Sequence, residues 1–160
     1  MPITNPEIIK AAASRVPASH RCRVARSGVD GSGAGAELAQ ITAENRYSFD
    51  QSCRVKAIEL AARLGLVSTG AALSINFLPN AVYEPEACIQ ATLAVSERVG
   101  WPKERLIFEI VESERIQDRP HVRGIIDAYR RMGFRVALDD FGTGHANLDL
   151  LTELHPDKLK

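Results

Sequence analysis

The sequence has few cysteines, few aromatic residues and no excess of charge of either sign. Its three cysteines, Cys22, Cys53 and Cys88, are odd in number and widely spaced. This spacing argues against a disulfide framework and against a zinc site built on cysteine pairs. Basic and acidic residues number 20 each, which excludes a strongly basic binder of DNA. Because the cysteines do not predict disulfide bonds, we expect a reducing, cytoplasmic setting.

Long hydrophobic runs are also absent. None approaches the roughly 20 residues that a membrane-spanning helix needs. The N-terminus lacks the charged segment followed by an apolar one that directs secretion. We expect no membrane segment in this chain. Of its 160 residues, 45% are hydrophobic and 25% are charged, which is the usual balance of one globular domain.

The first 35 residues predict little regular structure. Residues 11–15 are compatible with a short helix that Pro17 interrupts, and no β-strand is expected before residue 28. Residues 28–36 are rich in glycine and predict a linker. A phosphate-binding loop is the weaker alternative, because no apolar strand precedes these glycines and no Gly-Lys-Ser/Thr follows them. We expect residues 1–35 to form this segment and linker, and residues 36–160 to form the domain.

Helix and strand patterns alternate from residue 36 onward. A short helix is expected at 38–44, and a longer one starts at a Ser48 cap, has Gln51 at the capping-box position and ends at Gly65. The other predicted helices are 85–99, 118–132 and 146–154, and the strands are 71–77, 105–111, 134–138 and one that begins near 157. This alternation predicts an α/β fold with a mainly parallel sheet. Periodicity leaves open whether the sheet is doubly wound or closed into a barrel.

Polar residues stand at the ends of three of these strands. The first strand carries Asn76, the second carries Glu109 with Glu112 just beyond it, and the third ends in Asp139 and Asp140. Both candidate architectures place functional residues at the carboxyl ends of strands. Each residue taken alone is compatible with a hydrogen-bonded buried group or an exposed acid. Together, their oxygen ligands favour a site for Mg²⁺ or Mn²⁺.

Two further residues, Glu112 and Lys160, extend this prediction. Alternation along the second strand places Glu109 and Val111 on one face and Glu112 on the other, unless the strand has ended by then. Lys160 follows Leu159 in the last predicted strand. A lysine that points inward there could stabilise a phosphoryl charge or help to activate a metal-bound water. The alternative is a solvated lysine.

Four segments, in this order, resemble the successive motifs of the EAL domain family. They are Leu-Ser-Ile-Asn at 73–76, Phe-Glu-Ile-Val-Glu at 108–112, Asp-Asp-Phe-Gly-Thr-Gly at 139–144 and Asp-Lys-Leu-Lys at 157–160. That family hydrolyses cyclic di-GMP to linear pGpG in bacterial signal transduction. The resemblance covers residues 36–160 and implies a TIM-like (β/α) barrel of the EAL type. This chain would hold its central βα units, as a partial EAL domain.

The resemblance also implies roles for the polar residues. The residues assigned to metal binding are Asn76, Glu109 and Asp139 for one ion and Asp140 for a second. The catalytic assignment falls on Lys160, which would sit beside the attacking water, and on Glu112, which would support the site. The implied cofactor is Mg²⁺ or Mn²⁺, and the implied ligand is cyclic di-GMP.

The chain departs from the family pattern in three places. Arg23 stands where the glutamate of the Glu-Ala-Leu motif is expected, and a cation cannot ligate a metal. Residues 145–147 read His-Ala-Asn in a loop that couples dimerisation to the site in the family. The strands that close the barrel are absent after Lys160, so we expect an incomplete, truncated domain.

Two functions remain open on this basis. One is a metal-dependent cyclic di-GMP phosphodiesterase, and the other is a catalytically inactive EAL-like module that binds nucleotide or a signalling partner. A homodimer or larger oligomer is the expected assembly.

Overall fold

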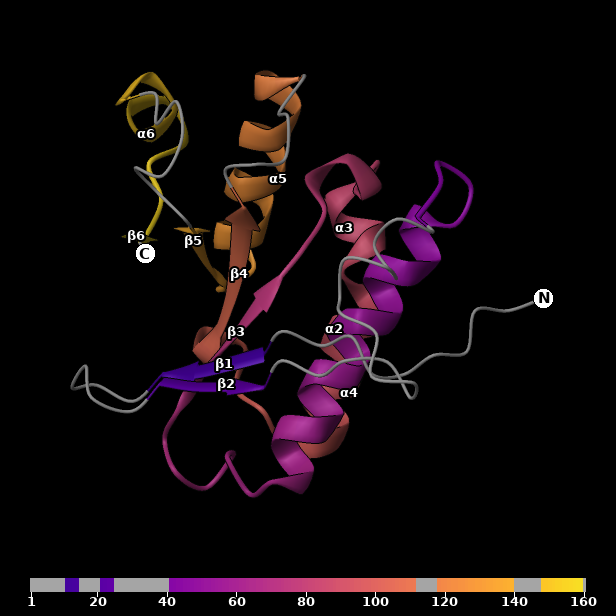
Figure 1. Ribbon diagram of the computed structural model, residues 1–160, viewed down its shortest axis with the longest axis vertical. Coiled ribbons are helices and arrows are strands. Elements are labelled where there is room, and N and C mark those ends of the chain that lie inside the picture. Colours follow the sequence, from indigo (N-terminus) through magenta and orange to yellow (C-terminus); the bar gives the residue numbers. More distant parts are fainter. Residues whose placement is uncertain (1–10, 15–20, 25–40, 112–117, 140–147, 160) are drawn as a thin grey trace.

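The computed structural model describes residues 11–14, 21–24, 41–111, 118–139 and 148–159 (Figure 1). Within these ranges the strands form a six-stranded sheet in the order β2-β1-β3-β4-β5-β6. The parallel strands are β3 (Ala72–Asn76), β4 (Leu106–Val111), β5 (Arg135–Asp139) and β6 (Lys158–Leu159). The antiparallel strands are β1 (Ala11–Ser14), which pairs with β3, and β2 (Arg21–Val24), which pairs with β1.

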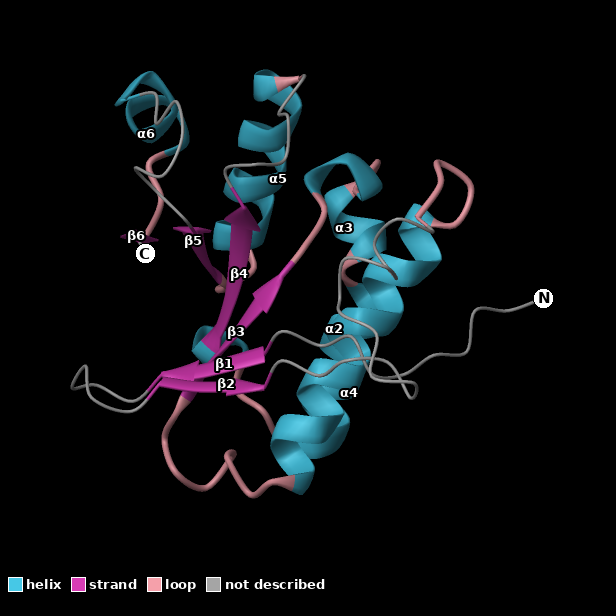
Figure 2. Ribbon diagram, viewed as in Figure 1, coloured by secondary structure: helices cyan, strands magenta, loops and turns pink. Residues whose placement is uncertain are grey.

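Helices precede or connect the parallel strands. They are α2 (Arg46–Arg63), α3 (Pro85–Cys88), α4 (Gln90–Val99), α5 (Arg119–Arg131) and α6 (Leu148–Leu154), with short 3₁₀ turns η1 (Pro79–Ala81) and η2 (Lys103–Arg105). Figure 2 shows α2 and α4 lying side by side, while α5 packs beside β4 and β5. No helix in the described ranges is long and apolar enough to cross a bilayer. The order of these helices and strands shows the predicted α/β alternation.

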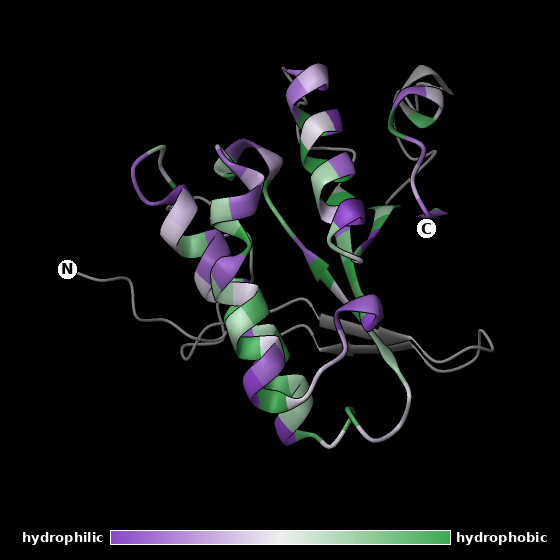
Figure 3. Cartoon of the chain, turned by 180° about the vertical axis from the view of Figure 1, so that it is seen from behind, coloured by the Kyte–Doolittle hydropathy of each residue, from purple (hydrophilic) through white to green (hydrophobic). Residues whose placement is uncertain are grey.

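The two faces of the sheet carry different residues, because successive side chains of a strand point in opposite directions. The face that packs against the helices carries Leu73, Ile75, Phe77, Leu106, Phe108, Ile110, Val136 and Leu138, all buried in one hydrophobic core. The opposite face carries Ser74, Asn76, Ile107, Glu109 and Ala137. In Figure 3 the strands β3, β4 and β5 are largely hydrophobic, whereas the helices show both hydrophobic and hydrophilic sides. The polar strand-end residues thus lie on the face away from the helices.

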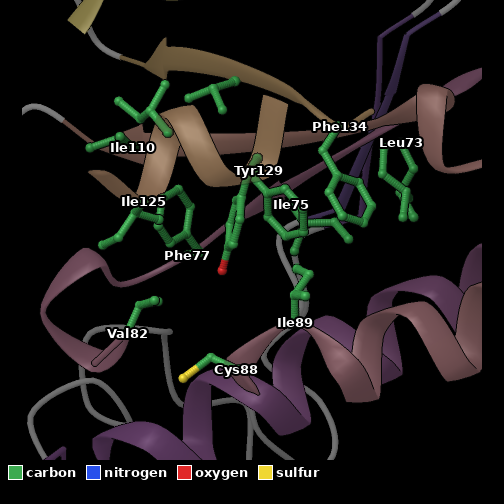
Figure 4. Close-up of a cluster of buried hydrophobic side chains, with 14 of the residues drawn as sticks. Leu73, Ile75, Phe77, Val82, Cys88, Ile89, Ile110, Ile125, Tyr129 and Phe134 are labelled. Atoms are coloured by element: carbon green, nitrogen blue, oxygen red, sulfur yellow. The ribbon is translucent and has the colours of Figure 1, made fainter. Parts of the chain in front are cut away.

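Aromatic rings form the centre of the core (Figure 4). The ring of Phe108 lies 4.9 Å from that of Tyr129 and 5.3 Å from that of Phe134, measured between centroids. Phe77 lies 5.8 Å from both Phe108 and Tyr129. A buried side chain of this size contributes roughly 1.5–3 kcal/mol through the area it removes from water. The cluster therefore ties β3, β4 and α5 together behind the strand ends.

Several predicted helix ends are confirmed. Asp118 caps α5 by accepting the His121 N–H at 2.9 Å. Gly65, Gly100 and Gly133 have φ values of 72°, 69° and 94° at the C-terminal ends of α2, α4 and α5. The predicted helix 85–99 is observed as α3 and α4, which are separated at Ile89.

The predicted start of α2 is wrong. The helix begins at Arg46 after the N-cap Asn45, so Ser48 lies inside its first turn. The reason is a turn at residues 43–45, just before the helix, in which the Thr42 N–H donates to Asn45 Oδ1 at 2.7 Å. Ser48 Oγ donates to the Asn45 carbonyl instead of capping. Of the predicted helix 38–44, the described part is not helical and enters a turn at residues 43–45, and the remainder lies outside the described residues.

The prediction for residues 11–15 is also wrong. The helix expected there is strand β1, and the strand-free region expected before residue 28 contains both β1 and β2. The register places Ala11 opposite Ile75 and Ser14 opposite Ala72. Alanine favours helices by intrinsic propensity, but the unpaired edge of β3 offers a ladder of backbone hydrogen bonds that outweighs so small a preference. Arg23, in β2, pairs with Ala12, which pairs in turn with Ser74.

Candidate metal site at the strand ends

The register of the parallel strands brings the predicted polar positions into one row. Asn76 of β3 lies directly opposite Glu109 of β4, and Glu109 lies opposite Ala137 of β5. Two positions further on, Val111 lies opposite Asp139. Positions two apart on a strand share a face. The backbone of Asp139 therefore continues the row of Asn76 and Glu109 at the carboxyl edge of the sheet.

Asn76 has the environment of a ligand. Asn76 as a whole is half-buried, but its side-chain oxygen Oδ1 is fully buried. This oxygen has no hydrogen-bond partner in the described part of the chain. A buried amide oxygen without a partner costs about 1–3 kcal/mol. The backbone around it is held in place, since the N–H of Phe77 donates to the Glu109 carbonyl at 3.1 Å. An orphaned oxygen at a fixed strand end fits a metal ligand.

Glu109 supplies the charge that such a site needs. The residue is only 3% exposed, in a strand whose other described side chains are apolar. A carboxylate and an amide oxygen are the hard oxygen donors that Mg²⁺ and Mn²⁺ prefer. The pair formed by Asn76 and Glu109 is thus compatible with the predicted cofactor.

The other predicted site residues are placed only in part. Asp139 is the last residue of β5, and its backbone alone is described. Glu112, Asp140 and Lys160 lie outside the described residues. Among side chains in the described ranges, no three His, Cys, Asp or Glu residues gather as a metal cluster. The described part therefore brings Asn76 and Glu109 together and leaves the remaining assignments as predictions.

A second polar feature lies behind this row and was not expected from the sequence. Asp50 and Arg54 of α2 form an ion pair of 2.6 Å with side chains 2% and 0% exposed. They belong to the buried stripe of α2, which comprises Asp50, Arg54, Ala57, Ile58 and Ala61. The detectable signal is this helical spacing, which places an acid and a base four residues apart in line with apolar residues.

The charges of this pair depend on each other. Burial raises the pKa of the Asp50 carboxyl, while the Arg54 charge and the N–H of Leu78 act in the opposite direction. Burial also tends to lower the pKa of Arg54, but Asp50 and the Tyr129 hydroxyl outweigh it, so this pKa lies above its ordinary value. Loss of either partner would leave the other charge buried and uncompensated.

The sequence pattern of the EAL domain family matches residues 38–160. The chain belongs to the EAL family. It is 33% identical to the blue light- and temperature-regulated antirepressor BluF of Escherichia coli over 115 residues, which are 71% of this chain and 28% of BluF. It is 36% identical to the probable cyclic di-GMP phosphodiesterase PdeI of E. coli over 90 residues, which are 55% of this chain and 11% of PdeI.

Solved EAL structures share the fold. A standalone EAL protein from Vibrio cholerae, in its c-di-GMP-bound form, is 45% identical with a TM-score of 0.74, over 82% of this chain and 54% of that chain. BlrP1 of Klebsiella pneumoniae, in complex with manganese and cy-diGMP, is 30% identical with a TM-score of 0.73, over 94% of this chain and 39% of that chain. The chain thus spans about half or less of the length of these proteins.

These similarities decide between the two architectures that the periodicity left open. The sheet with its helices on one face is part of a TIM-like EAL barrel, as the resemblance implied. The face that carries Asn76 and Glu109 is the one turned away from the helices, which corresponds to the inside of such a barrel.

Proposed function

We propose that this EAL chain carries part of the divalent-metal site of a cyclic di-GMP phosphodiesterase. The observation that carries the proposal is the pairing of Asn76 with Glu109, with Asn76 Oδ1 buried and without a partner in the described residues. Solved EAL relatives bind c-di-GMP, and one of them binds it with manganese. Divalent metal dependence is therefore proposed for this chain, with Mg²⁺ or Mn²⁺ as the ion.

The ligand set follows the row of strand ends. Asn76 and Glu109 would hold one ion together with Asp139, whose backbone continues the same row on β5. Asp140 would serve a second ion, which its place directly after Asp139 supports. An amide beside the carboxylates limits the negative charge facing a substrate that carries two phosphates.

The bound ions would polarise the phosphodiester and lower the pKa of a coordinated water. Asn76 and Glu109 would fix the geometry, because their backbones are joined by the sheet and their oxygens are held at a rigid edge. Lys160 would hold its charge beside the attacking water, and Glu112 would support the ligands. In the reaction the water oxygen bonds to phosphorus, one bridging P–O bond breaks and the departing ribose oxygen takes up a proton, which gives linear pGpG.

A titration with Mn²⁺ that is monitored by electron paramagnetic resonance tests the site directly. We expect the chain to bind Mn²⁺ and Asn76→Ala to weaken that binding at least tenfold. Ser74→Ala is the matched control, since Ser74 lies on the same strand and face two residues earlier. The absence of Mn²⁺ binding by the unaltered chain would contradict the proposal.

Incubation with cyclic di-GMP and Mn²⁺ then separates the two functions of an EAL chain. Formation of pGpG above a metal-free blank supports the phosphodiesterase. Binding of cyclic di-GMP without pGpG would assign the chain to the inactive, nucleotide-binding module. The relative BluF is named an antirepressor and not a phosphodiesterase, so the test includes this second outcome.

Setting and assembly complete the proposal. The widely spaced cysteines fit a reducing cytoplasm. A homodimer or larger oligomer is the proposed assembly, and light scattering on the purified chain measures it.

A further inference from the structure

The buried ion pair of α2 has no evident role in stability. Asp50 and Arg54 are one helical turn apart, and their side chains are almost completely removed from water. The attraction between two buried charges rarely exceeds the cost of dehydrating them, and apolar residues of similar volume often replace such pairs without loss of stability. A pair of this kind therefore calls for another explanation, which its remaining contacts supply.

Asp50 reaches the end of β3. Its Oδ1 accepts the backbone N–H of Leu78 at 2.9 Å, two residues beyond Asn76. Its other oxygen, Oδ2, pairs with Arg54. A charged acceptor makes a stronger and more directional hydrogen bond than a neutral one. The carboxylate therefore fixes the backbone at the point where the chain leaves the strand and turns into η1.

Arg54 reaches the residues next to both proposed ligands. Its guanidinium carbon lies 5.3 Å from the ring centre of Phe77 and 5.1 Å from that of Phe108. Phe77 follows Asn76 in the chain, and Phe108 precedes Glu109. Because neighbours on a strand point in opposite directions, the guanidinium lies behind the sheet at the level of the proposed metal site. Stacking of a desolvated guanidinium on aromatic rings is favourable and holds the rings in place.

Tyr129 completes the network. Its hydroxyl accepts a hydrogen bond from Arg54 Nη1 at 2.8 Å. In Figure 4 this hydroxyl points away from α5 into the core, toward the side where Val82 and Cys88 lie. The network therefore links α2, the ends of β3 and β4, and the helix that leads into β5.

We propose that Asp50 and Arg54 are positioning residues for the proposed metal site, which hold the ends of β3 and β4 at the spacing that Asn76 and Glu109 need to share an ion. This inference rests on the proposed function. Neither residue touches the ion, since both lie on the helix-covered side of the sheet. Groups that hydrogen-bond metal ligands directly typically affect metal affinity by roughly 10- to 100-fold, and we expect an effect at the lower end of this range here.

The test replaces both charges at once in the full chain, as Asp50→Leu with Arg54→Met, so that no charge is left buried alone. Mn²⁺ affinity is measured by electron paramagnetic resonance, and amide hydrogen exchange is measured without metal. We expect Mn²⁺ binding at least tenfold weaker and faster exchange at Leu78 but not at Ile75, with a urea midpoint lowered at most by the lost hydrogen bonds of the Leu78 N–H and the Tyr129 hydroxyl. The matched control is Lys56→Gln, which removes the exposed partner of an ion pair on the same helix, keeps the pair of Glu59 with Arg98, and should leave all three readouts unchanged.

The outcomes separate the two claims. Unchanged Mn²⁺ affinity in the double variant overturns the positioning role while the metal site stands. Weaker binding accompanied by a large fall in the urea midpoint and by faster exchange throughout the sheet also overturns it, because the pair would then be merely structural. If the unaltered chain binds no Mn²⁺, the proposed function fails and this inference fails with it. The titration of the unaltered chain alone distinguishes this result from a failure of the positioning role.

Discussion

Asn76 and Glu109 are direct register partners in the parallel pair of β3 and β4, and the side-chain oxygen of Asn76 is buried with no partner in the described residues. A position kept for stability alone would satisfy that oxygen or replace it by an apolar group. Stability and function should therefore oppose each other at residue 76, as they do at many active sites.

Replacing Asn76 by leucine, which has a similar size, tests this opposition. We expect the free energy of unfolding in urea to stay level or to rise by about 1 kcal/mol, because an unpaired buried oxygen is removed. Binding of Mn²⁺ should be lost in the same variant. A clear loss of stability would show instead that the amide is needed by the fold.

Glycine conformation gives a second prediction, with a control in the same segment. Gly133 ends α5 with a φ of 94°, whereas Gly124 lies on the exposed side of α5 with no atom near an added Cβ. Gly133→Ala should lower the free energy of unfolding by about 1–2 kcal/mol, since a Cβ is strained at positive φ. Gly124→Ala should raise it by about 0.5–1 kcal/mol, because alanine is the better helix former. Effects of the same sign in both variants would contradict this account.

The elements that the sequence predicted well are those with local signals that agree. Asp118 as cap, Pro120 in the first turn and Gly133 at the end all point to one helix, and α5 has those limits. The alignment of Asn76 with Glu109 could also be predicted, because parallel strands bring their carboxyl ends to the same edge.

The elements that the sequence did not predict depend on contacts distant in the chain. The alanines at 11–13 favour a helix in isolation, and only pairing with β3 makes them a strand. Asp50 and Arg54 look like solvent-exposed residues of a helix, because charged side chains are seldom buried. Their burial follows from the aromatic rings of β3, β4 and α5, which close around the guanidinium.

Arg105 gives a third prediction at the opposite end of the strands. Its guanidinium donates to the carbonyls of Ala71, Val67 and Leu66 at 2.7, 2.9 and 3.2 Å. It also lies 5.2 Å from the centre of the Trp101 ring. Lysine keeps the charge but cannot reproduce the planar fork of donors. Arg105→Lys should therefore lower the free energy of unfolding by about 1–3 kcal/mol.

The control for Arg105 is another arginine with a single exposed partner. Arg98 pairs with Glu59 at 2.8 Å, and its side chain is 63% exposed. Exposed pairs contribute little, so Arg98→Lys should change the free energy of unfolding by less than about 0.5 kcal/mol. Equal effects of the two substitutions in urea unfolding would show that the three carbonyl contacts of Arg105 add nothing.

The thiol of Cys53 gives a prediction that depends on pH. Burial, with a contribution from the nearby Asp50 charge, raises the pKa of Cys53 from 9.0 to about 12. The folded state thus disfavours the thiolate. The stability that this shift contributes is fully present below pH 9, the unfolded value, and is lost as the pH rises toward 12.

Reactivity measures the same shift, because the thiolate is the species that attacks a disulfide reagent. With Cys53 as the remaining cysteine, in a Cys22→Ser and Cys88→Ala background, the folded chain at pH 8 should react on the order of 1,000-fold more slowly than the chain in urea. The rate should keep rising above pH 9 for as long as circular dichroism shows a folded chain. A rate that levels off near pH 9 would mean that the thiol titrates normally, and that the first turns of α2 admit water to the side of the helix next to Asp50.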